Sequence, residues 1–83
     1  MTYTQFEKTD TYGGELNYSW VRRWYTDELL TEGQAVRLAK KLAGFTGMRC
    51  RKVSYDDEVY LFPSGICQAV GIRSTDYPEG EKL

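Results

Sequence analysis

A pair of glycines, Gly13 and Gly14, constrains the fold of this chain more than any other feature of its sequence. Paired glycines adopt positive φ at little steric cost, which favours a tight turn between antiparallel strands. Residues 2–9, before the turn, alternate between two faces as a strand does. Residues 16–26, after the turn, hold both tryptophans of the chain. The sequence therefore predicts a β-hairpin whose second strand supplies much of the large side-chain area.

The second predicted strand has two unequal faces. A period of two places the larger and more apolar side chains together on one face: Leu16, Tyr18, Trp20, Arg22 and Trp24. The other face receives Asn17, Ser19, Val21, Arg23 and Tyr25. We expect the first face to pack against the core and Tyr25, on the second face, to be exposed.

Residues 31–43 carry the pattern of an amphipathic helix. Thr31 and Gln34 match a capping box, and Gly44 matches the left-handed residue that commonly follows a helix. Apolar residues with helical spacing lie between these ends: Ala35, Leu38, Ala39 and Leu42. The small alanines on this face predict that the helix approaches the sheet closely.

Three further strands are expected after the helix, at residues 48–55, 58–62 and 66–73. The order β-β-α-β-β-β predicts an α+β fold, with a single antiparallel β-sheet and one amphipathic helix packed on one of its faces. We expect residues 1–73 to form a single compact domain and residues 74–83 to form a mobile acidic C-terminal tail.

Size and composition limit the chemistry that is open to this chain. A chain of 83 residues leaves little room for a deep cleft, and the absence of histidine removes the commonest general base and metal ligand. We therefore expect no enzymatic activity, no metal and no cofactor. No secretory signal or membrane-spanning run occurs, which predicts a cytoplasmic protein without membrane contact. Cys50 and Cys67 are expected to be reduced thiols, with a disulfide between them as the alternative.

Charge is distributed unevenly along the chain, although the net charge is −1. The middle of the chain is basic and both ends are acidic, an arrangement that orients partners. Six basic residues are candidates for one phosphate-binding patch: Arg37, Lys40, Lys41, Arg49, Arg51 and Lys52. The competing interpretation is a solvated helix face beside a charged edge strand.

Aromatic and acidic residues suggest contact surfaces as well. The aromatic set comprises Tyr18, Trp20, Trp24, Tyr25, Tyr55 and Tyr60. We expect most of these rings to fill the core and any that remain outside to anchor a protein interface. The acidic turn formed by Asp56, Asp57 and Glu58 is either a plain turn with favourable aspartate chemistry or a contact surface that imitates phosphates.

Several segments of the chain resemble a set of small phage- and prophage-encoded proteins. The likeness begins in residues 10–23, with Gly-Gly-Glu-Leu-Asn-Tyr-Ser-Trp-Val at its centre. It continues through the helix at residues 34–37, the Met-Arg-Cys-Arg strand at 48–51 and the hairpin at 54–64, and covers about residues 3–72. The resemblance implies a non-enzymatic phage or mobile-element protein that binds and inhibits a host protein or nucleoprotein complex. A CRISPR effector complex is the partner that we consider foremost.

These interpretations give two sets of expected binding residues. A protein partner is expected to contact Arg22, Arg23, Tyr25, Asp56, Asp57 and Glu58. The alternative function is a small nucleic-acid-binding module that uses the six basic residues of the helix and the following strand. A homodimer through a free sheet edge is a further hypothesis.

Overall fold

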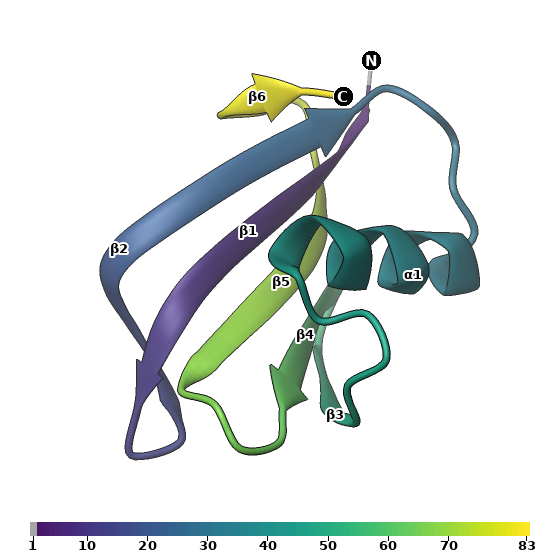
Figure 1. Cartoon of the computed structure of the whole chain (residues 1–83). Coiled ribbons are helices and arrows are strands. Elements are labelled where there is room, and N and C mark those ends of the chain that lie inside the picture. The colour runs from purple at the N-terminus through teal and green to yellow at the C-terminus, as the bar shows by residue number, and fades with distance from the viewer. Residues whose placement is uncertain (1) are drawn as a thin grey trace.

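The hairpin predicted around the two glycines forms the middle of the fold. A computed structural model describes residues 2–83 (Figure 1), so that Met1 of the predicted domain 1–73 lies outside the described residues. Strands β1 (Tyr3–Tyr12) and β2 (Glu15–Thr26) pair antiparallel, and Gly13 and Gly14 turn the chain with φ of 61° and 84°.

The remaining strands complete one six-stranded sheet in the order β3-β4-β5-β1-β2-β6. They are β3 (Cys50–Tyr55), β4 (Glu58–Pro63), β5 (Gln68–Thr75) and the short β6 (Glu81–Lys82). The α+β class is confirmed, but the sheet is not wholly antiparallel, because β6 pairs parallel to β2. The fifth strand begins later than predicted and runs two residues past the predicted domain boundary, because its pairing with β1 continues to Thr75.

Helix α1 (Glu32–Ala43) forms as its sequence predicts. Thr31 and Gln34 make the reciprocal hydrogen bonds of a capping box, and Gly44 ends the helix with a φ of 77°. The alanines of one face are buried where the helix contacts β5 and β1. Figure 1 shows the helix across this one face of the sheet. The core between the two layers contains Phe6, Trp24, Ala35, Ala39, Ala43, Phe45, Leu61, Val70 and Ile72.

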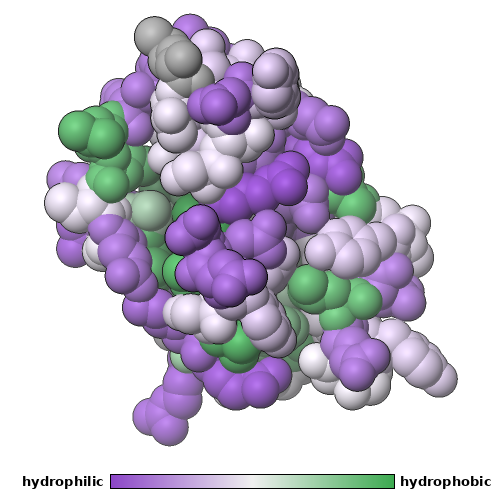
Figure 2. All heavy atoms as spheres, turned by 180° about the vertical axis from the view of Figure 1, so that it is seen from behind, coloured by the Kyte–Doolittle hydropathy of each residue, from purple (hydrophilic) through white to green (hydrophobic). Residues whose placement is uncertain are grey.

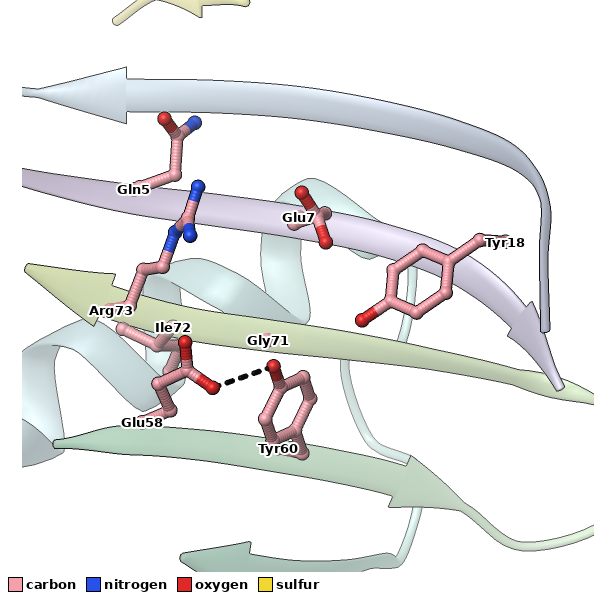
Figure 3. A pocket seen from close by; sticks show the side chains of 8 residues that line it. All are labelled: Gln5, Glu7, Tyr18, Glu58, Tyr60, Gly71, Ile72 and Arg73. Atoms are coloured by element: carbon pink, nitrogen blue, oxygen red, sulfur yellow. Dashed lines mark hydrogen bonds between the residues drawn. The ribbon is translucent and has the colours of Figure 1, made fainter. Parts of the chain in front are cut away.

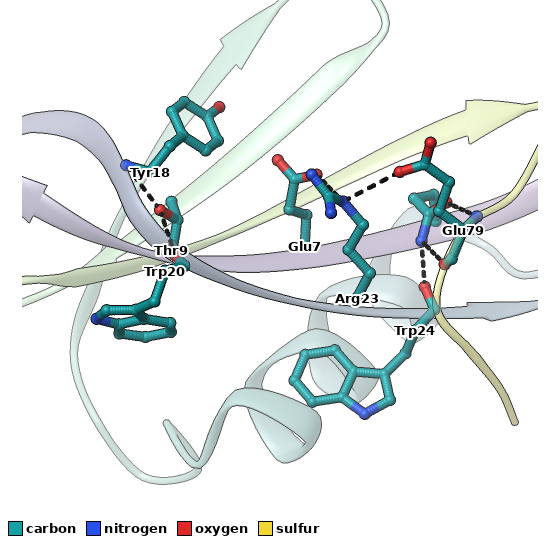
Figure 4. Close-up of polar contacts among 8 residues, drawn as sticks. Glu7, Thr9, Tyr18, Trp20, Arg23, Trp24 and Glu79 are labelled. Atoms are coloured by element: carbon teal, nitrogen blue, oxygen red, sulfur yellow. Dashed lines mark hydrogen bonds and ion pairs between the residues drawn. The ribbon is translucent and has the colours of Figure 1, made fainter.

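The hairpin contains a large bulge that the alternation of residues did not reveal. Thr9 pairs with Val21 and Thr11 with Leu16, so four residues of β2 lie opposite the single residue Asp10. Tyr18, inside the bulge, has a φ of 57°. Figure 4 shows the rings of Trp20 and Trp24 on one side of β2 and Tyr18 on the other. The prediction that Tyr18 shares a face with the tryptophans is therefore wrong.

Side chains of β1 hold this bulge in place. The hydroxyl of Thr9 accepts a hydrogen bond from the Tyr18 amide at 3.1 Å and donates one to the Trp20 carbonyl at 3.2 Å. The Asp10 carboxylate accepts hydrogen bonds from the Ser19 amide at 2.9 Å and from the Asn17 side chain at 2.8 Å. The hydrogen bonds from Ser19 and then Asn17 hold the pKa of the Asp10 carboxyl well below its usual range.

The expectation that most of the aromatic set fills the core is also wrong. Of the six rings, only Trp24 is buried; the core receives Phe6 and Phe45 instead. Tyr18, Trp20 and Tyr55 are exposed, and Tyr25 and Tyr60 are half-buried. The bulge and the position of the helix together decide this distribution, because α1 crosses the sheet away from the turn end of β2 (Figure 1).

The C-terminal residues lie along β2. The side chain of Gln5, which is fully buried, donates to the carbonyls of Trp24 at 2.8 Å and Glu79 at 2.7 Å, and accepts from the Glu79 amide at 2.7 Å. The Leu83 amide donates to the carbonyl of Tyr25. The segment 74–83, expected to be a mobile acidic tail, makes these contacts and contains β6; its mobility stays a prediction.

Candidate binding surface

The face of the sheet opposite α1, which we call the open face, carries polar and aromatic side chains. Phe6 points into the core, so its neighbours Gln5 and Glu7 point to the open face. The register places Arg23 and Gly71 on either side of Glu7, and Tyr60 beyond Gly71. Figure 2, which views the molecule from behind, shows a mainly hydrophilic surface with small separate apolar groups.

A hollow of about 160 Å³ lies in the open face around Gly71. The ring of Tyr60 lies so close to Gly71 that a Cβ atom there would approach its Cε1 atom to 2.6 Å. Tyr18, turned to this side by the bulge, reaches the hollow from β2 (Figure 3). Glycine in the interior of a strand often marks such a close approach. The missing side chain of Gly71 thus makes room for the Tyr60 ring at the edge of the hollow.

Polar groups in the hollow are held by one another. The Tyr60 hydroxyl donates a hydrogen bond to the Glu58 carboxylate at 2.9 Å (Figure 3). Burial, and secondarily this hydrogen bond, raise the pKa of Tyr60 above its usual range. Gln5 and Arg73 also line the hollow. The single O–H of the phenol is thus committed to Glu58, and its oxygen remains free to accept a hydrogen bond.

An ion-pair network borders the hollow on the side of β2. The guanidinium of Arg23 lies 2.8 Å from the Glu7 carboxylate and 3.4 Å from that of Glu79 (Figure 4). The hydrogen bond to Glu7 raises the pKa of Arg23 above its usual value. Arg23 links β2, β1 and the C-terminal segment, so its charge is largely neutralised within the fold.

The residues predicted to contact a protein partner do not form one surface. Arg22 lies on the side of β2 that faces α1, with its guanidinium 5.0 Å from the ring centre of Trp24. Arg23 lies on the open face. Tyr25, expected to be exposed, is half-buried because its ring packs edge-on against Tyr3 at 5.6 Å. Only Arg23 and Tyr25 of these three share the open face.

The acidic turn lies near the open face, at the β3–β4 end of the sheet. Asp56 and Asp57 are exposed, and Asp56 adopts a φ of 49° that suits an aspartate in a turn. A second, shallower hollow of about 410 Å³ separates this turn from Arg73 and the end of β5. Glu58 borders both hollows. Asp56, Asp57 and Glu58 are therefore continuous with the surface around Gly71.

The six basic residues are divided between different surfaces. Arg37, Lys40 and Lys41 line a shallow depression on the helix with Thr46 and Gly47, and Lys40 donates to the Met48 carbonyl at 2.9 Å. On β3 the two basic side chains point in opposite directions: Lys52 pairs with Glu32 of the helix, while Arg51 lies 4.9 Å from the ring centre of Phe62. Arg49, just before β3, is exposed. The six residues therefore do not lie on one continuous surface, and their binding of phosphates stays a prediction.

Sequence reasoning expected Tyr18 and Tyr60 among rings that mostly fill the core. It did not single out the other missed residues of the hollow, which are Gln5, Glu7, Gly71, Ile72 and Arg73. The one signal available was Gly71, a glycine between strand-forming residues. The other positions depend on strand register, which brings together residues about 65 positions apart.

Other features predicted from the sequence are placed as follows. Cys50 and Cys67 are both free thiols. Within residues 2–83 there is no group of three or more acidic, cysteine or histidine residues arranged to hold a metal ion, and no helix with the length and apolar character needed to cross a membrane.

No protein-family model, curated protein or solved structure matched the chain. The resemblance to phage proteins therefore stays a prediction.

Proposed function

We propose that this protein is a non-enzymatic binding protein that docks a protein partner through the open face. The observation that carries the proposal is an uncovered sheet face in which tyrosines and arginines surround the hollow at Gly71. Tyrosine and arginine contribute much of the binding energy in protein interfaces, especially at central pockets. Tyr18 and Tyr60 are the anchors that we expect at the centre of the interface.

The size of the hollow favours a partner side chain over a small-molecule substrate. Its volume of about 160 Å³ is well below the roughly 300–1,000 Å³ of typical ligand pockets. Its polar groups offer acceptors, at the carboxylates of Glu58 and Glu7 and the hydroxyl oxygen of Tyr60, and a donor at Arg73. A partner side chain with a hydrogen-bonding tip fits such a site, and the flat surface around it provides the remaining contact area.

The resemblance noted in residues 10–23 extends the proposal to inhibition of a host protein or nucleoprotein complex by a phage or mobile-element protein. A CRISPR effector complex in the host cytoplasm is the foremost candidate. Asp56 and Asp57 support this reading, because their exposed carboxylates continue the open face and can occupy positions that a nucleic-acid phosphate would take.

The test is a comparison of two tyrosine variants. Tyr18→Ala removes one wall of the hollow, whereas Tyr12→Ala removes a ring that is 80% exposed at the hairpin turn and outside the hollow. We expect a bacterial lysate rich in nucleoprotein defence complexes to yield a partner with the wild type and Tyr12→Ala but not with Tyr18→Ala. The purified partner should bind the wild type at least about tenfold more tightly than Tyr18→Ala.

If the wild type and both variants bind the partner equally well, the open face is not the docking surface. If the partner is an effector nuclease, its activity should fall as the wild type is added and recover with Tyr18→Ala. If the partner binds through the open face but its activity is unchanged, the docking proposal stands and the inhibition proposal is wrong.

The alternative, nucleic-acid binding by the six basic residues, has weaker support. Lys52 is paired with Glu32, Lys40 is engaged by a backbone carbonyl, and Arg51 lies on another face from Lys52. The six residues therefore do not offer one continuous surface to a nucleic acid.

A further inference from the structure

Two cations lie directly opposite each other on the side of the hairpin that faces α1. Lys8 of β1 and Arg22 of β2 are register partners, and like charges in such positions destabilise a sheet. Burial, and the neighbouring charge of Arg22, lower the pKa of Lys8. Within residues 2–83 neither side chain forms an ion pair, whereas Arg23, one residue further along β2, has two acidic partners. The fold thus leaves these two charges uncompensated.

Aromatic rings flank both cations. The Lys8 ammonium lies 5.8 Å from the ring centre of Trp20 and 5.4 Å from that of Phe45, and Arg22 lies over Trp24. Cations over aromatic faces are held in place by the ring quadrupole, which fixes Lys8 and Arg22 as neighbours. Phe45 and Trp24 are buried, but Trp20 is 40% exposed. The row of rings and cations therefore ends in an accessible indole.

No acidic side chain of the hairpin forms an ion pair with Lys8 or Arg22. The nearest acidic residue along β1 on this side is Asp10, whose carboxylate is oriented by hydrogen bonds from Ser19 and Asn17 of the bulge and forms no ion pair with either cation. Glu7 lies on the open face with Arg23. The surface consequently combines two positive charges with a flat exposed ring, and a complementary ligand combines a negative charge with a flat ring.

We propose that Lys8, Arg22 and Trp20 form a binding site for one nucleotide unit of a single-stranded nucleic acid. The phosphate lies between the Lys8 ammonium and the Arg22 guanidinium, which offers two parallel donors. The base stacks on the exposed part of Trp20, as bases do on aromatic side chains in single-strand-binding proteins. The site is separate from the open face and from the six basic residues predicted earlier, so it goes beyond the proposed function.

The first test is a nuclear magnetic resonance titration with hexathymidylate at low salt. The indole N–H signal of Trp20 should shift, whereas that of the buried Trp24 should shift less. Two phosphate-contacting cations predict that log K falls with log salt with a slope of about −1.4 for a single strand. In Lys8→Met, which keeps the aliphatic stem over Phe45, the slope should become shallower, at about −0.7.

The second test separates stacking from charge. Trp20→Ala should weaken hexathymidylate binding about 5- to 150-fold, and Trp20→Phe should restore much of the affinity. An abasic hexamer of equal charge should bind the wild type as weakly as hexathymidylate binds Trp20→Ala. Lys82→Met is the matched control, because it removes an exposed lysine of β6, outside this site and outside the six basic residues, and should leave the affinity unchanged.

Three results would each overturn the proposal. The first is the absence of any Trp20 shift at millimolar hexathymidylate and low salt. The second is a loss of affinity in Lys41→Met that equals or exceeds the loss in Lys8→Met, which would move the binding to the helix. The third is that a hexaglutamate peptide binds as tightly as hexathymidylate and keeps its affinity in Trp20→Ala. That result would mean that the two cations bind an acidic protein segment. None of these results depends on whether Tyr18 docks a partner.

Discussion

Strand β1 presents two residues of equal burial on the two faces of the sheet. Phe6 and Gln5 are both fully buried, yet Phe6 packs into the core under α1 and Gln5 lies on the open face beneath the C-terminal segment. Phe6 is covered by apolar side chains, and Gln5 is covered by backbone groups to which its amide is hydrogen-bonded. Burial of Phe6 on the face under α1 therefore depends on apolar packing, whereas burial of Gln5 on the open face depends on hydrogen bonds.

This contrast explains why the two faces have different uses. A packed apolar face is closed, because its side chains interdigitate and leave no room for a partner. Within residues 2–83 the C-terminal segment covers the open face at β2 and at Gln5 of β1, and the hollow at Gly71 stays accessible. The four predictions below test the contrast from the largest expected effect to the smallest.

Removing a ring from each face should give unequal losses of stability. Phe6→Ala should lower the free energy of unfolding by about 3–5 kcal/mol, because it leaves a cavity in the core. Phe62→Ala, on the half-buried open-face side of β4, should cost about 1 kcal/mol. Urea denaturation followed by circular dichroism measures both. Similar losses in the two variants would show that the open face is packed as tightly as the core.

Replacing Gln5 should release the C-terminal segment. Gln5→Leu leaves the Glu79 amide and the Trp24 and Glu79 carbonyls without this partner, so we expect a loss of about 2–3 kcal/mol. Amide hydrogen exchange of residues 79–83 should accelerate at the same time. In a chain that ends at Pro78, the same substitution should cost much less. If these amides exchange at unprotected rates in the wild type, the mobile tail predicted from the sequence is correct.

Filling the hollow should disturb the open face and spare the core. In Gly71→Ala the new Cβ atom would meet the Tyr60 ring, which must swing aside, and we expect a cost of about 1 kcal/mol. Chemical shifts should change at Tyr60 and Tyr18 but not at Phe45 on the other face. A core-wide shift would mean that the ring of Tyr60 cannot move independently. Gly33→Ala, with open space around it on the helix, is the matched control.

Protonating Asp10 should weaken the bulge that turns Tyr18 to the open face. Because hydrogen bonds lower the folded-state pKa of Asp10 below the unfolded value of about 3.9, they add stability above that pH. This contribution is lost as the pH falls through the lowered pKa, so the wild type should lose more stability than Asp10→Asn below about pH 4. Asp57→Asn removes an equal charge from an exposed turn and should keep the wild-type slope. Parallel curves for the wild type and Asp10→Asn would contradict this role.

The local elements of this protein follow from its sequence. The hairpin turn required two residues that tolerate positive φ, and only Gly13 and Gly14 offered them side by side. The helix was specified by Thr31, Gln34 and Gly44, whose capping hydrogen bonds involve neighbours a few residues away. The α+β class followed from the order of these elements. Such features depend on short-range geometry, which a sequence displays directly.

The candidate surfaces were decided by the tertiary structure. The bulge at Asp10 reversed the face of Tyr18, and the path of α1 left Trp20 partly exposed while Phe45 entered the core. Gln5, Glu7 and Arg73 came together only through strand register, and Glu79, which precedes β6, is held by the side chain of Gln5, 74 residues away. Periodicity in a sequence states which residues alternate. It does not state where a bulge interrupts the alternation or which face the helix will cover, because both depend on contacts between distant segments.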